Sequence, residues 1–587
     1  MKLIEARIKN FRSIENETIR FGDTTVFFGK NDSGKSNILK ALEFALTRGY
    51  PEEADIRITS DNQDPRSQST SVDVLFLITD NVEGADTEEY EKLSSYLSEN
   101  AITIDERDRG LLAFRAELSF NREKDRYEKT HRVINDWDDP NSIGIPLPAE
   151  AFDVLDFILL DAHRDISETI RDRRSRWNSE LSQPGIDEER AASMDVALSN
   201  LGKDIVDASP FLTRAQNELR NATDRPSSEI EISPISRNLG ELYRGLDIIV
   251  QEENGGVGLP MSQSGSGTRS RAVFLLYKSL LDLQLAAARK SDIPYYCLVA
   301  FEEPEAHVHP QSQQQLLDLF STLGTQRVVT THSPYILSVA SLDDLCLVRR
   351  DTSATTCISL GALQLDNNQK REVSRYIMRS HGELLFADAV ILGEGETEEQ
   401  AIPVFFEHRF GCHPFAKGVA VLEVGGVKYD PFLMLFNLLG TQWFILSDGE
   451  ERTLNAVRSQ LKKSLGLRGR PDLASYPQIV IWGNGNDYEA GLLEEGYAEE
   501  MVEAIDVFHG GIGDGSVFEQ MMRRDTGYDS TDDIYGYLPH FMNSRSTNKT
   551  RYARAVAEAI ANNVHGKPPI PPAIDRLFDE LNSRLGW

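Results

Sequence analysis

The 587-residue sequence predicts an α/β protein with two successive regions built on parallel sheets. Three observations lead to this prediction: a glycine-rich segment at 29–36 lies between a strand pattern and a helix pattern, a buried strand pattern at 295–301 ends in glutamates, and another at 388–392 ends in an acidic turn. Strands that alternate with helices are typical of parallel sheets, and functional groups gather at the carboxyl ends of such strands. The length predicts two to four domains.

Composition excludes several classes of protein. The chain is 40% hydrophobic and 26% charged, which is typical of a soluble globular protein. Its apolar runs are much shorter than the roughly 20 residues of a membrane helix, and its start lacks the apolar core of a signal peptide. The four scattered cysteines have no CxxC spacing, so neither a zinc cage nor a disulfide framework is indicated. These features predict a cytoplasmic protein without a membrane partner.

The net charge of −31, from 62 basic and 93 acidic residues, bears on the partner. A passive DNA coat needs Lys and Arg to neutralise phosphates, and this chain is too acidic for that role. A DNA enzyme with a local basic surface and acidic metal ligands is still compatible with it.

Residues 29–36 match the pattern GxxxxGK[ST], with a strand at 24–28 before them and a helical pattern at 37–46 after them. The loop N–H groups and the helix N-terminus would hold the phosphates of ATP. Lys35 would reach the β- and γ-phosphates, and Ser36 would hold Mg²⁺. The predicted nucleotide ligands here are Gly29, Asn31, Ser33, Gly34, Lys35, Ser36 and Asn37.

Three further segments fit a nucleotide site. The strand at 295–301 ends in Glu302 and Glu303, where the first carboxylate would support Mg²⁺ and the second would polarise the attacking water. A strand at 327–331 ends in His332, which would sense the γ-phosphate. A Ser/Gly turn contains Ser264, Gly265 and Gly267 and leads into a helical stretch at 272–286. The alternatives are a solvated acidic turn, a satisfied turn histidine and an ordinary flexible loop.

The order of these motifs resembles the ABC-type ATPase heads of the RecF and SMC class. In that class ATP lies between two heads. The resemblance therefore implies a homodimer or higher homo-oligomer, in which Ser264, Gly265 and Gly267 of one protomer cover the nucleotide held by Lys35 of the other.

The segment at 166–250 is more than a minimal ATPase needs, and its polar helical pattern predicts an inserted helical region that serves dimerisation. Near its start, five arginines between 164 and 176 lie beside Trp177. Such a cluster could grip a DNA backbone, or it could be a solvated helix face paired with neighbouring acids. The sequence leaves both interpretations open.

After residue 383 the pattern begins again, with strands at 387–392, 443–446 and 477–482 that each precede acidic residues. The carboxyl ends of parallel strands share one edge, so these acids would meet in one crevice. Hard oxygen ligands suit Mg²⁺ or Mn²⁺, and two such ions could act on a phosphodiester. The predicted metal ligands are Glu394, Glu398, Asp448, Glu450 and Glu489. The alternative is that acids simply populate loop ends in an acidic protein.

The segments at 393–398 and 447–450 resemble the TOPRIM fold of topoisomerases, primases and several nucleases. The usual second TOPRIM motif is Asp-x-Asp, whereas this chain has Asp448 and Glu450. An ABC-type head upstream of TOPRIM resembles the overcoming-lysogenization-defect (OLD) family of nucleases, a group that includes Gabija nuclease subunits. The family has a C-terminal lysine near the metals, and Lys549 is the best match to it by position. If the match holds, Lys549 would stabilise negative charge on the scissile phosphate; the alternative is an ordinary lysine at a helix start.

The predicted architecture is therefore a P-loop ABC-type ATPase head with a helical insertion, followed by a Rossmann-like TOPRIM domain. The predicted boundaries are 1–165 and 251–383 for the head, 166–250 for the insertion and 384–587 for TOPRIM. The resemblance implies an ATP-binding, metal-dependent DNA endonuclease for defence against phage or foreign DNA, with a UvrD-like helicase partner in the Gabija-like interpretation. The predicted catalytic residues are Glu394, Asp448, Lys549 and Glu303. The alternative is a RecF/SMC-like repair ATPase with a non-catalytic TOPRIM domain.

Overall fold

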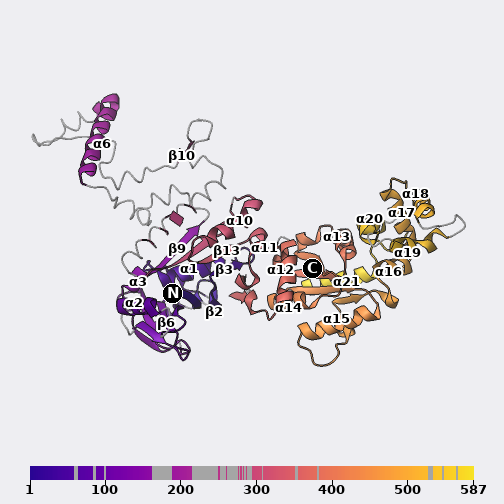
Figure 1. The fold of residues 1–587 in the computed structure, drawn as a ribbon, viewed down its shortest axis with the longest axis horizontal. Coiled ribbons are helices and arrows are strands. Elements are labelled where there is room, and N and C mark those ends of the chain that lie inside the picture. Colours follow the sequence, from indigo (N-terminus) through magenta and orange to yellow (C-terminus); the bar gives the residue numbers. More distant parts are fainter. Residues whose placement is uncertain are drawn as a thin grey trace, which may run out of the picture. The chain divides into compact units, whose positions relative to one another are not determined.

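The computed structural model contains two compact units, neither of which is a continuous stretch of chain (Figure 1). Unit 1 comprises Met1–Arg12 and Ser36–Thr331, and unit 2 comprises Ser13–Lys35 and His332–Trp587. The predicted domain boundaries at 165, 250 and 383 stay predictions. The structure describes residues 1–58, 64–82, 87–97, 101–139, 141–161, 188–214, 249–250, 259–260, 294–306, 308–350, 354–379, 382–525, 533–544, 548–562 and 566–587, with isolated positions between 275 and 286.

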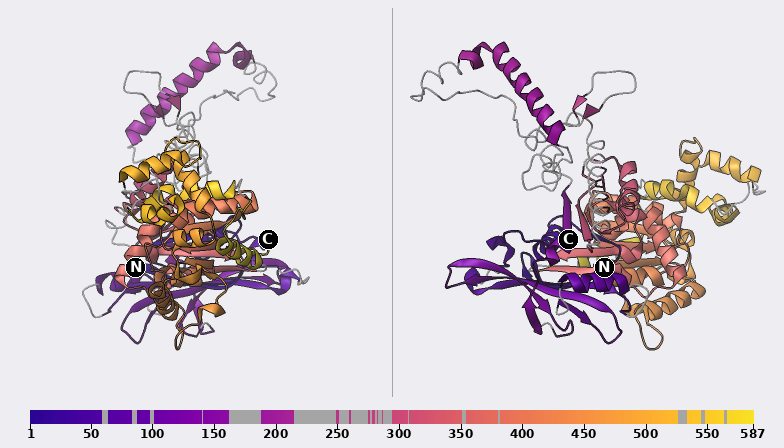
Figure 2. Two further views of the ribbon diagram at one scale, coloured as in Figure 1. Left: turned by 90° about the vertical axis from the view of Figure 1, so that its right-hand side faces the viewer. Right: turned by 60° about the vertical axis from the view of Figure 1, so that its left-hand side comes forward.

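Unit 1 contains an antiparallel run of strands in the order β8-β7-β6-β4-β1, with β5 paired to β6. The strands are β1 (Lys2–Phe11), β4 (Ser69–Thr79), β5 (Ile102–Ile104), β6 (Gly110–Asn121), β7 (Arg126–Ile134) and β8 (Ile143–Pro146). The ribbons of this sheet extend as long neighbouring arrows in the right-hand view of Figure 2. Asp73 on β4 faces Arg115 on β6, and its buried carboxylate accepts two guanidinium hydrogen bonds of 2.6 and 2.8 Å. This pair fixes the register of two buried strands.

Unit 1 also contains three parallel strands in the order β13-β12-β9. They are β9 (Leu155–Asp161), β12 (Tyr296–Glu302) and β13 (Gln326–Thr331), and helix α10 (Pro310–Ser321) connects β12 to β13. Phe320 of α10 stacks on Phe301 of β12 with ring centroids 3.8 Å apart. The remaining described elements of the unit are α2 (Thr87–Leu97), α3 (Ala151–Val154), α6 (Glu188–Ala208), β10 (Ile249–Val250) and β11 (Leu259–Pro260).

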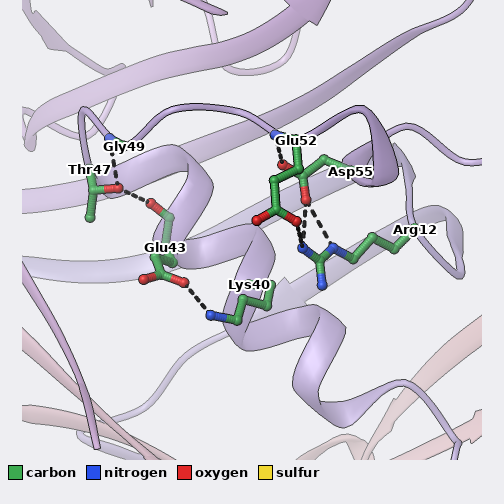
Figure 3. A network of polar contacts seen from close by, with 7 residues as sticks. All are labelled: Arg12, Lys40, Glu43, Thr47, Gly49, Glu52 and Asp55. Carbon is green, nitrogen blue, oxygen red and sulfur yellow. Dashed lines mark hydrogen bonds and ion pairs between the residues drawn. The ribbon is translucent and has the colours of Figure 1, made fainter. Parts of the chain in front are cut away.

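Helix α1 (Lys35–Leu46) follows the glycine-rich loop, and polar contacts hold the chain that leaves it (Figure 3). Arg12 donates to the Asp55 carboxylate at 2.9 and 2.7 Å and lies 3.8 Å from the Glu52 carboxylate. Within the helix, Lys40 pairs with Glu43 at 2.8 Å. The Arg12 contacts fasten segment 52–55 to the end of β1, so the exit of α1 has a defined path.

The first sheet of unit 2 has the order β2-β15-β14-β3. Its strands are β2 (Ile14–Arg20), β3 (Thr24–Phe28), β14 (Leu345–Arg350) and β15 (Thr355–Ser359), accompanied by helices α11 (Pro334–Val339) and α12 (Asn367–Arg379). Strand β3 is rich in β-branched and aromatic residues, which favour a buried strand. It runs parallel to β14, with Val26 opposite Leu345. The glycine-rich loop therefore leaves the carboxyl end of a buried parallel strand, as predicted.

The second sheet of unit 2 is fully parallel, in the order β17-β16-β18-β19. Its strands are β16 (Ala389–Gly393), β17 (Val419–Glu423), β18 (Gln442–Ser447) and β19 (Ile479–Ile481). After β16 the chain goes to one neighbour, β17, and then crosses to the other, β18. Such a reversal opens a crevice at the carboxyl ends of the two strands that flank it. This is the edge where the sequence predicts the acidic residues.

Helices cover this parallel sheet and extend beyond it (Figure 1). They are α13 (Glu396–Phe410), α14 (Asp430–Leu439), α15 (Glu451–Ser464), α16 (Tyr488–Glu494), α17 (Ala498–Phe508), α18 (Ser516–Asp525), α19 (Ile534–Ser544), α20 (Asn548–Ala561) and α21 (Pro572–Leu585). One apolar core joins the sheet to these helices, with Phe405 and Phe406 of α13 fully buried against Val556 and Ile560 of α20 and others. None of the helices in the described part of the chain is long and apolar enough to span a membrane.

Candidate functional site

The loop at 29–36 adopts a conformation that requires its glycines. Gly29 has φ +154° and Gly34 has φ +104°. A Cβ atom on Gly29 would lie 2.1 Å from the Val348 carbonyl oxygen, and one on Gly34 would lie 2.3 Å from the Thr355 hydroxyl. Any larger residue would push the loop away from strands β14 and β15.

Lys35 folds back over this loop and contacts the predicted sensor histidine. Its side chain is 5% exposed. The ammonium group donates to the carbonyl oxygens of Gly29 at 3.2 Å and Lys30 at 3.0 Å, and it lies 3.4 Å from Nδ1 of His332. The structure thus brings together two predicted nucleotide residues that are far apart in the sequence, at a loop suited to a phosphate group.

Ser33 has a buried hydroxyl that contacts no hydrogen-bonding partner among the described residues. Its backbone N–H donates to the Lys30 carbonyl at 3.3 Å, and its carbonyl accepts from the Thr355 hydroxyl at 2.9 Å. These backbone contacts hold the turn in place, so the Ser33 hydroxyl is left for a ligand. Ser36 and Asn37, also predicted, lie in the first turn of α1.

A pocket beside the loop is lined by an ion pair that connects the loop to the residue before β16. Residues 29–33, 347–350 and 385–388 line it, together with Leu439 and Thr441, and the predicted ligand Asn31 is among them. The Lys30 ammonium donates to both carboxylate oxygens of Asp388, at 2.6 and 2.7 Å. Asp388 directly precedes β16, so the loop is tied to the start of that strand.

Glu302 and Glu303 lie at the carboxyl end of β12. Glu303 has φ +45°, a left-handed conformation that non-glycine residues adopt at a cost and that is often found at functional positions. Its N–H donates to the Thr330 carbonyl at 3.0 Å, which fixes it against β13. Both glutamates belong to unit 1, whereas Lys35 belongs to unit 2. A nucleotide site shared by these residues stays a prediction.

Several predicted features lie outside the described residues. These are the trans-acting turn, the arginine cluster at 164–176 with Trp177, and most of the helical insertion at 166–250. The turn residues concerned are Ser264, Gly265 and Gly267. Their roles stay predictions.

Glu394 and Asp448 follow the two central strands of the parallel sheet and meet at its carboxyl edge. Strands β16 and β18 are paired in register, with Gly393 opposite Leu446. One oxygen of Glu394, Oε1, accepts from the Ser447 hydroxyl at 2.8 Å and from the Asp448 backbone N–H at 3.0 Å. Burial raises the pKa of Glu394, and these two hydrogen bonds act against that rise. These hydrogen bonds therefore hold Glu394 next to Asp448, as the sequence predicts.

The surroundings of Asp448 and Glu398 raise the pKa values of both side chains toward neutral pH. Burial, followed by the charges of Glu394 and Glu398, raises the pKa of Asp448 to about 8. Burial also raises the pKa of Glu398 to about 7, and Glu489 adds to this effect. Oδ1 of Asp448 is buried and contacts no hydrogen-bonding group among the described residues. Like-charged carboxylates packed in this way are stabilised when a cation binds them.

Glu398 is positioned by the start of α13. It is 5% exposed, and its Oε2 accepts from the Gly395 N–H at 3.1 Å, as in a capping box. Gly393 is required beside it, because a Cβ atom there would lie 2.7 Å from the Cβ atom of Glu398. The helix start therefore directs this carboxylate toward the crevice.

Lys549, at the start of α20, pairs with two acids next to α16. Its ammonium group lies 2.6 Å from Oδ2 of Asp487 and 3.0 Å from Oε2 of Glu489. The hydrogen bonds with these acids raise the pKa of Lys549 against the opposing effect of burial. The other oxygen of Glu489, Oε1, is buried without a hydrogen-bonding partner in the described part of the chain. Predicted residues Lys549 and Glu489 therefore lie together.

Sequence reasoning missed Asp487 and Tyr429. Asp487 caps α16 through Oδ1, which accepts from the Ala490 N–H at 2.9 Å, while Oδ2 receives Lys549. An aspartate just before a helix pattern is a recognisable cap signal, but it does not reveal the second contact. Tyr429 is fully buried, and burial followed by the charges of Glu394 and Glu398 raises its pKa well above the usual value. No local pattern indicates that this tyrosine lies near the carboxylates.

Glu450, the residue that departs from the usual TOPRIM pattern, has an exposed side chain at the start of α15. Its charge contributes to the raised pKa of Glu394. Between it and Asp448, Gly449 has no room for a side chain, since a Cβ atom would lie 2.2 Å from the Trp482 carbonyl oxygen. Across the described residues, no three His, Cys, Asp or Glu side chains are already arranged to hold a metal ion. The predicted roles as metal ligands stay predictions.

Comparison with known families follows the two sets of motifs. Residues 1–337 match the AAA ATPase domain family. Residues 385–449, which include Glu394, Glu398 and Asp448, match the TOPRIM domain of overcoming lysogenization defect protein-like proteins.

Three relatives show how far the similarity extends. An uncharacterized protein of Escherichia coli, YbjD, is 28% identical over 41% of this chain and 42% of its own length. The Old nuclease of Escherichia phage P2 is 24% identical over 76% of this chain and 77% of its own. The endonuclease GajA of Bacillus cereus is 24% identical over 81% of this chain and 80% of its own. The chain belongs to the AAA ATPase domain family, and after that domain it carries a TOPRIM domain similar to that of overcoming lysogenization defect proteins.

Proposed function

We propose that the chain is an ATP-dependent, divalent-metal-dependent DNA endonuclease. The observation that carries this proposal is the cluster of carboxylates at the ends of β16 and β18, where buried oxygens of Asp448 and Glu489 contact no hydrogen-bonding group among the described residues. Two relatives that match most of this chain are named as nucleases, the phage P2 Old nuclease and GajA. A role in defence against phage fits the GajA similarity.

The donor set fits a hard divalent cation such as Mg²⁺ or Mn²⁺. Its members are carboxylates, and oxygen ligands are what these cations prefer. Glu394, Glu398, Asp448 and Glu489 would hold two ions, and Glu450 would join from the exposed side. When bound, the ions supply an activated water and stabilise the leaving oxygen of a phosphodiester.

The residues around the cluster position it for this chemistry. The Ser447 hydroxyl and the Asp448 N–H fix one oxygen of Glu394, so its other oxygen has a defined direction. Asp487 holds the Lys549 ammonium in its charged form beside Glu489. From there Lys549 would stabilise negative charge that develops on the scissile phosphate.

The glycine-rich loop at 29–36, called the nucleotide loop from here on, would regulate cleavage at the carboxylate cluster. Lys35, Ser33 and the loop N–H groups would bind the phosphates, Ser36 and Glu302 would hold Mg²⁺, Glu303 would polarise water and His332 would sense the γ-phosphate. The Ser264, Gly265 and Gly267 turn of a second protomer would complete the site in a homodimer. A UvrD-like helicase partner belongs to the same Gabija-like proposal.

Plasmid cleavage tests the proposal. Wild type, Glu394→Ala and Lys35→Ala are compared with Mg²⁺ or Mn²⁺, each with and without ATP. Glu394→Ala should lose cleavage at every ATP concentration, whereas Lys35→Ala should change only the response to ATP. Glu396→Ala serves as the matched control, because Glu396 is an exposed acid on the same helix start as Glu398. It should cut like wild type.

The outcomes separate the competing functions. If Glu394→Ala cuts as well as wild type, the carboxylate cluster is not the active site. If the wild type hydrolyses ATP and binds DNA without cutting it under any metal condition, the chain is instead a RecF/SMC-like repair ATPase with a non-catalytic TOPRIM domain. Equal activity of Lys35→Ala and wild type across ATP concentrations would contradict control by nucleotide.

A further inference from the structure

A basic and aromatic patch lies on the helices next to the crevice. Helix α17 ends at Phe508, whose side chain is 46% exposed. The guanidinium of Arg551, on the second turn of α20, lies 5.2 Å from the centre of the Phe508 ring and 5.5 Å from that of Tyr552. We call Phe508, Arg524 and Arg551 the arginine patch. It lies outside the carboxylate cluster and outside the nucleotide loop.

The aromatic support of Arg551 comes from the core of unit 2. Tyr552 is 1% exposed and belongs to the apolar core. Its hydroxyl lies 2.8 Å from Nε2 of His509, and its ring meets Phe508 edge to face at 5.2 Å. A guanidinium on such a platform loses little freedom when it forms hydrogen bonds, since its plane is already fixed.

Two arginines from different helices lie near His509. The pKa of His509 is lowered by burial and then by the nearby charges of Arg551 and Arg524, which come from α20 and α18. Arg551 is exposed, and within the described residues its contacts are the two rings rather than a carboxylate. In a chain of net charge −31, an exposed arginine whose contacts among the described residues are aromatic rings is available to bind an external anion.

The position of the patch indicates which anion. Arg551 follows Lys549 by two residues, so the two side chains leave the same end of α20 on different sides of the helix. Lys549 contacts Asp487 and Glu489 of the crevice. Double-stranded DNA carries a phosphate about every 3.4 Å of helix axis on each strand, so a duplex that lies across this helix end brings phosphates to Arg551 while one strand is held at the crevice. The exposed Phe508 ring offers a surface for a sugar or base.

We propose that the arginine patch binds the DNA backbone that flanks the strand in the crevice, with Arg551 as its principal phosphate contact. This inference rests on the proposed function, because it assumes that DNA is the substrate. Arg551 is a positioning residue here and takes no part in the bond-breaking step. Its role is to hold the duplex so that one phosphodiester faces Glu394 and Asp448.

Fluorescence anisotropy of a labelled DNA duplex without divalent metal, over a range of salt, tests the inference with the full chain. The variants are Arg551→Ala, Arg551→Lys and Arg554→Ala. Arg554 is the matched control: it lies on the same helix and is exposed, but it pairs with Glu558 at 2.8 Å. Arg551→Ala should weaken binding about tenfold and reduce the salt slope by about one. Arg551→Lys should keep the slope, because the charge remains, yet bind more weakly because the planar fork is lost.

Arg554→Ala should bind within about twofold of wild type, as expected for a solvated ion pair. If Arg551→Ala matches Arg554→Ala in both affinity and salt slope, the patch is a structural contact and the inference is wrong. A wild type that binds no duplex at any salt would also overturn it. If DNA binds through Arg551 but is never cut with any metal, the proposed function fails while the patch stands.

Discussion

The nucleotide loop and the carboxylate crevice of unit 2 share one backbone plan but carry opposite charges. Both follow buried parallel strands, β3 beside β14 in one case and β16 beside β18 in the other. At the loop, an ammonium group and a buried hydroxyl lie among backbone groups. At the crevice, burial and then the charges of neighbouring carboxylates raise the pKa values of Asp448 and Glu398. In both regions the carboxyl end of a parallel strand positions the site, and the side chains there determine whether an anion or a cation binds.

The largest expected effect comes from neutralising one member of the crevice. Asp448→Asn keeps the shape of the side chain but removes a charge that Glu394 and Glu398 oppose. Cleavage should fall about a thousandfold, because a cation ligand is lost. The thermal midpoint without metal should rise by about 2–4 °C, since the amide has no charged form for burial and the neighbouring carboxylates to oppose. A plasmid assay and a thermal scan measure both. A fall in the midpoint together with lost activity would mean that the variant simply folds badly.

The second-largest effect should be the rise in thermal midpoint that each ligand causes, because the cation and the nucleotide should act on different regions. Mn²⁺ alone should raise the thermal midpoint of wild type and Lys35→Ala but not of Asp448→Asn. A nucleotide without metal should stabilise wild type and Asp448→Asn but not Lys35→Ala. At a hundred times Kd each ligand contributes about 2.7 kcal/mol. If Mn²⁺ stabilises Asp448→Asn as much as wild type, the crevice is not the site of the cation.

A glycine substitution should cost less and tests the loop alone. Gly34→Ala places a Cβ atom 2.3 Å from the Thr355 hydroxyl at φ +104°, whereas Gly466→Ala, at φ +62°, meets open space. The free energy of unfolding should drop by about 2 kcal/mol for the first and about 1 kcal/mol for the second. Chemical denaturation measures the difference. Equal losses of unfolding free energy in the two variants would show that the loop can shift to make room for the added Cβ atom.

The smallest effect should come from the ion pair between the loop and the crevice strand. Lys30 and Asp388 are 64% and 47% exposed, so solvent screens their attraction. A double-mutant cycle with Lys30→Ala and Asp388→Ala should give a coupling of at most about 1 kcal/mol, falling as salt rises. A larger coupling that resists salt would indicate that the pair is shielded from solvent.

In both regions the sequence predicted the strands, loops and helices that a local sequence pattern determines. The strand, loop and helix at 24–46 appear as predicted, because GxxxxGK[ST] has one backbone solution and the flanking periodicity is clear. The expected strand at 443–446 is β18 at 442–447, and it brings Asp448 to Glu394. Parallel strands leave little freedom in where their ends meet, so this convergence follows from the topology.

Other contacts depend on packing that no local pattern encodes. Tyr429 near the carboxylates, Asp487 holding Lys549 and Arg551 stacked on Phe508 all join elements whose approach is set by the core of unit 2. Single-sequence reasoning identified Lys549 only through its family resemblance. It expected metal ligands among the acids but could not show how burial and neighbouring charges would raise the pKa values of Asp448 and Glu398.

The division of the chain between the two units has a consequence for biosynthesis. Strands β2 and β3, which carry the residues leading into the nucleotide loop, are translated before residues 36–331 of unit 1. Their partners in unit 2 are β15 and β14, which are translated only when residues 345–359 appear. The pairing of β2 with β15 and of β3 with β14 therefore has to wait until residues 36–331 of unit 1 have been made. A fragment starting at His332 would lack them altogether, so the nuclease half cannot be severed from its first 35 residues without removing strands from unit 2.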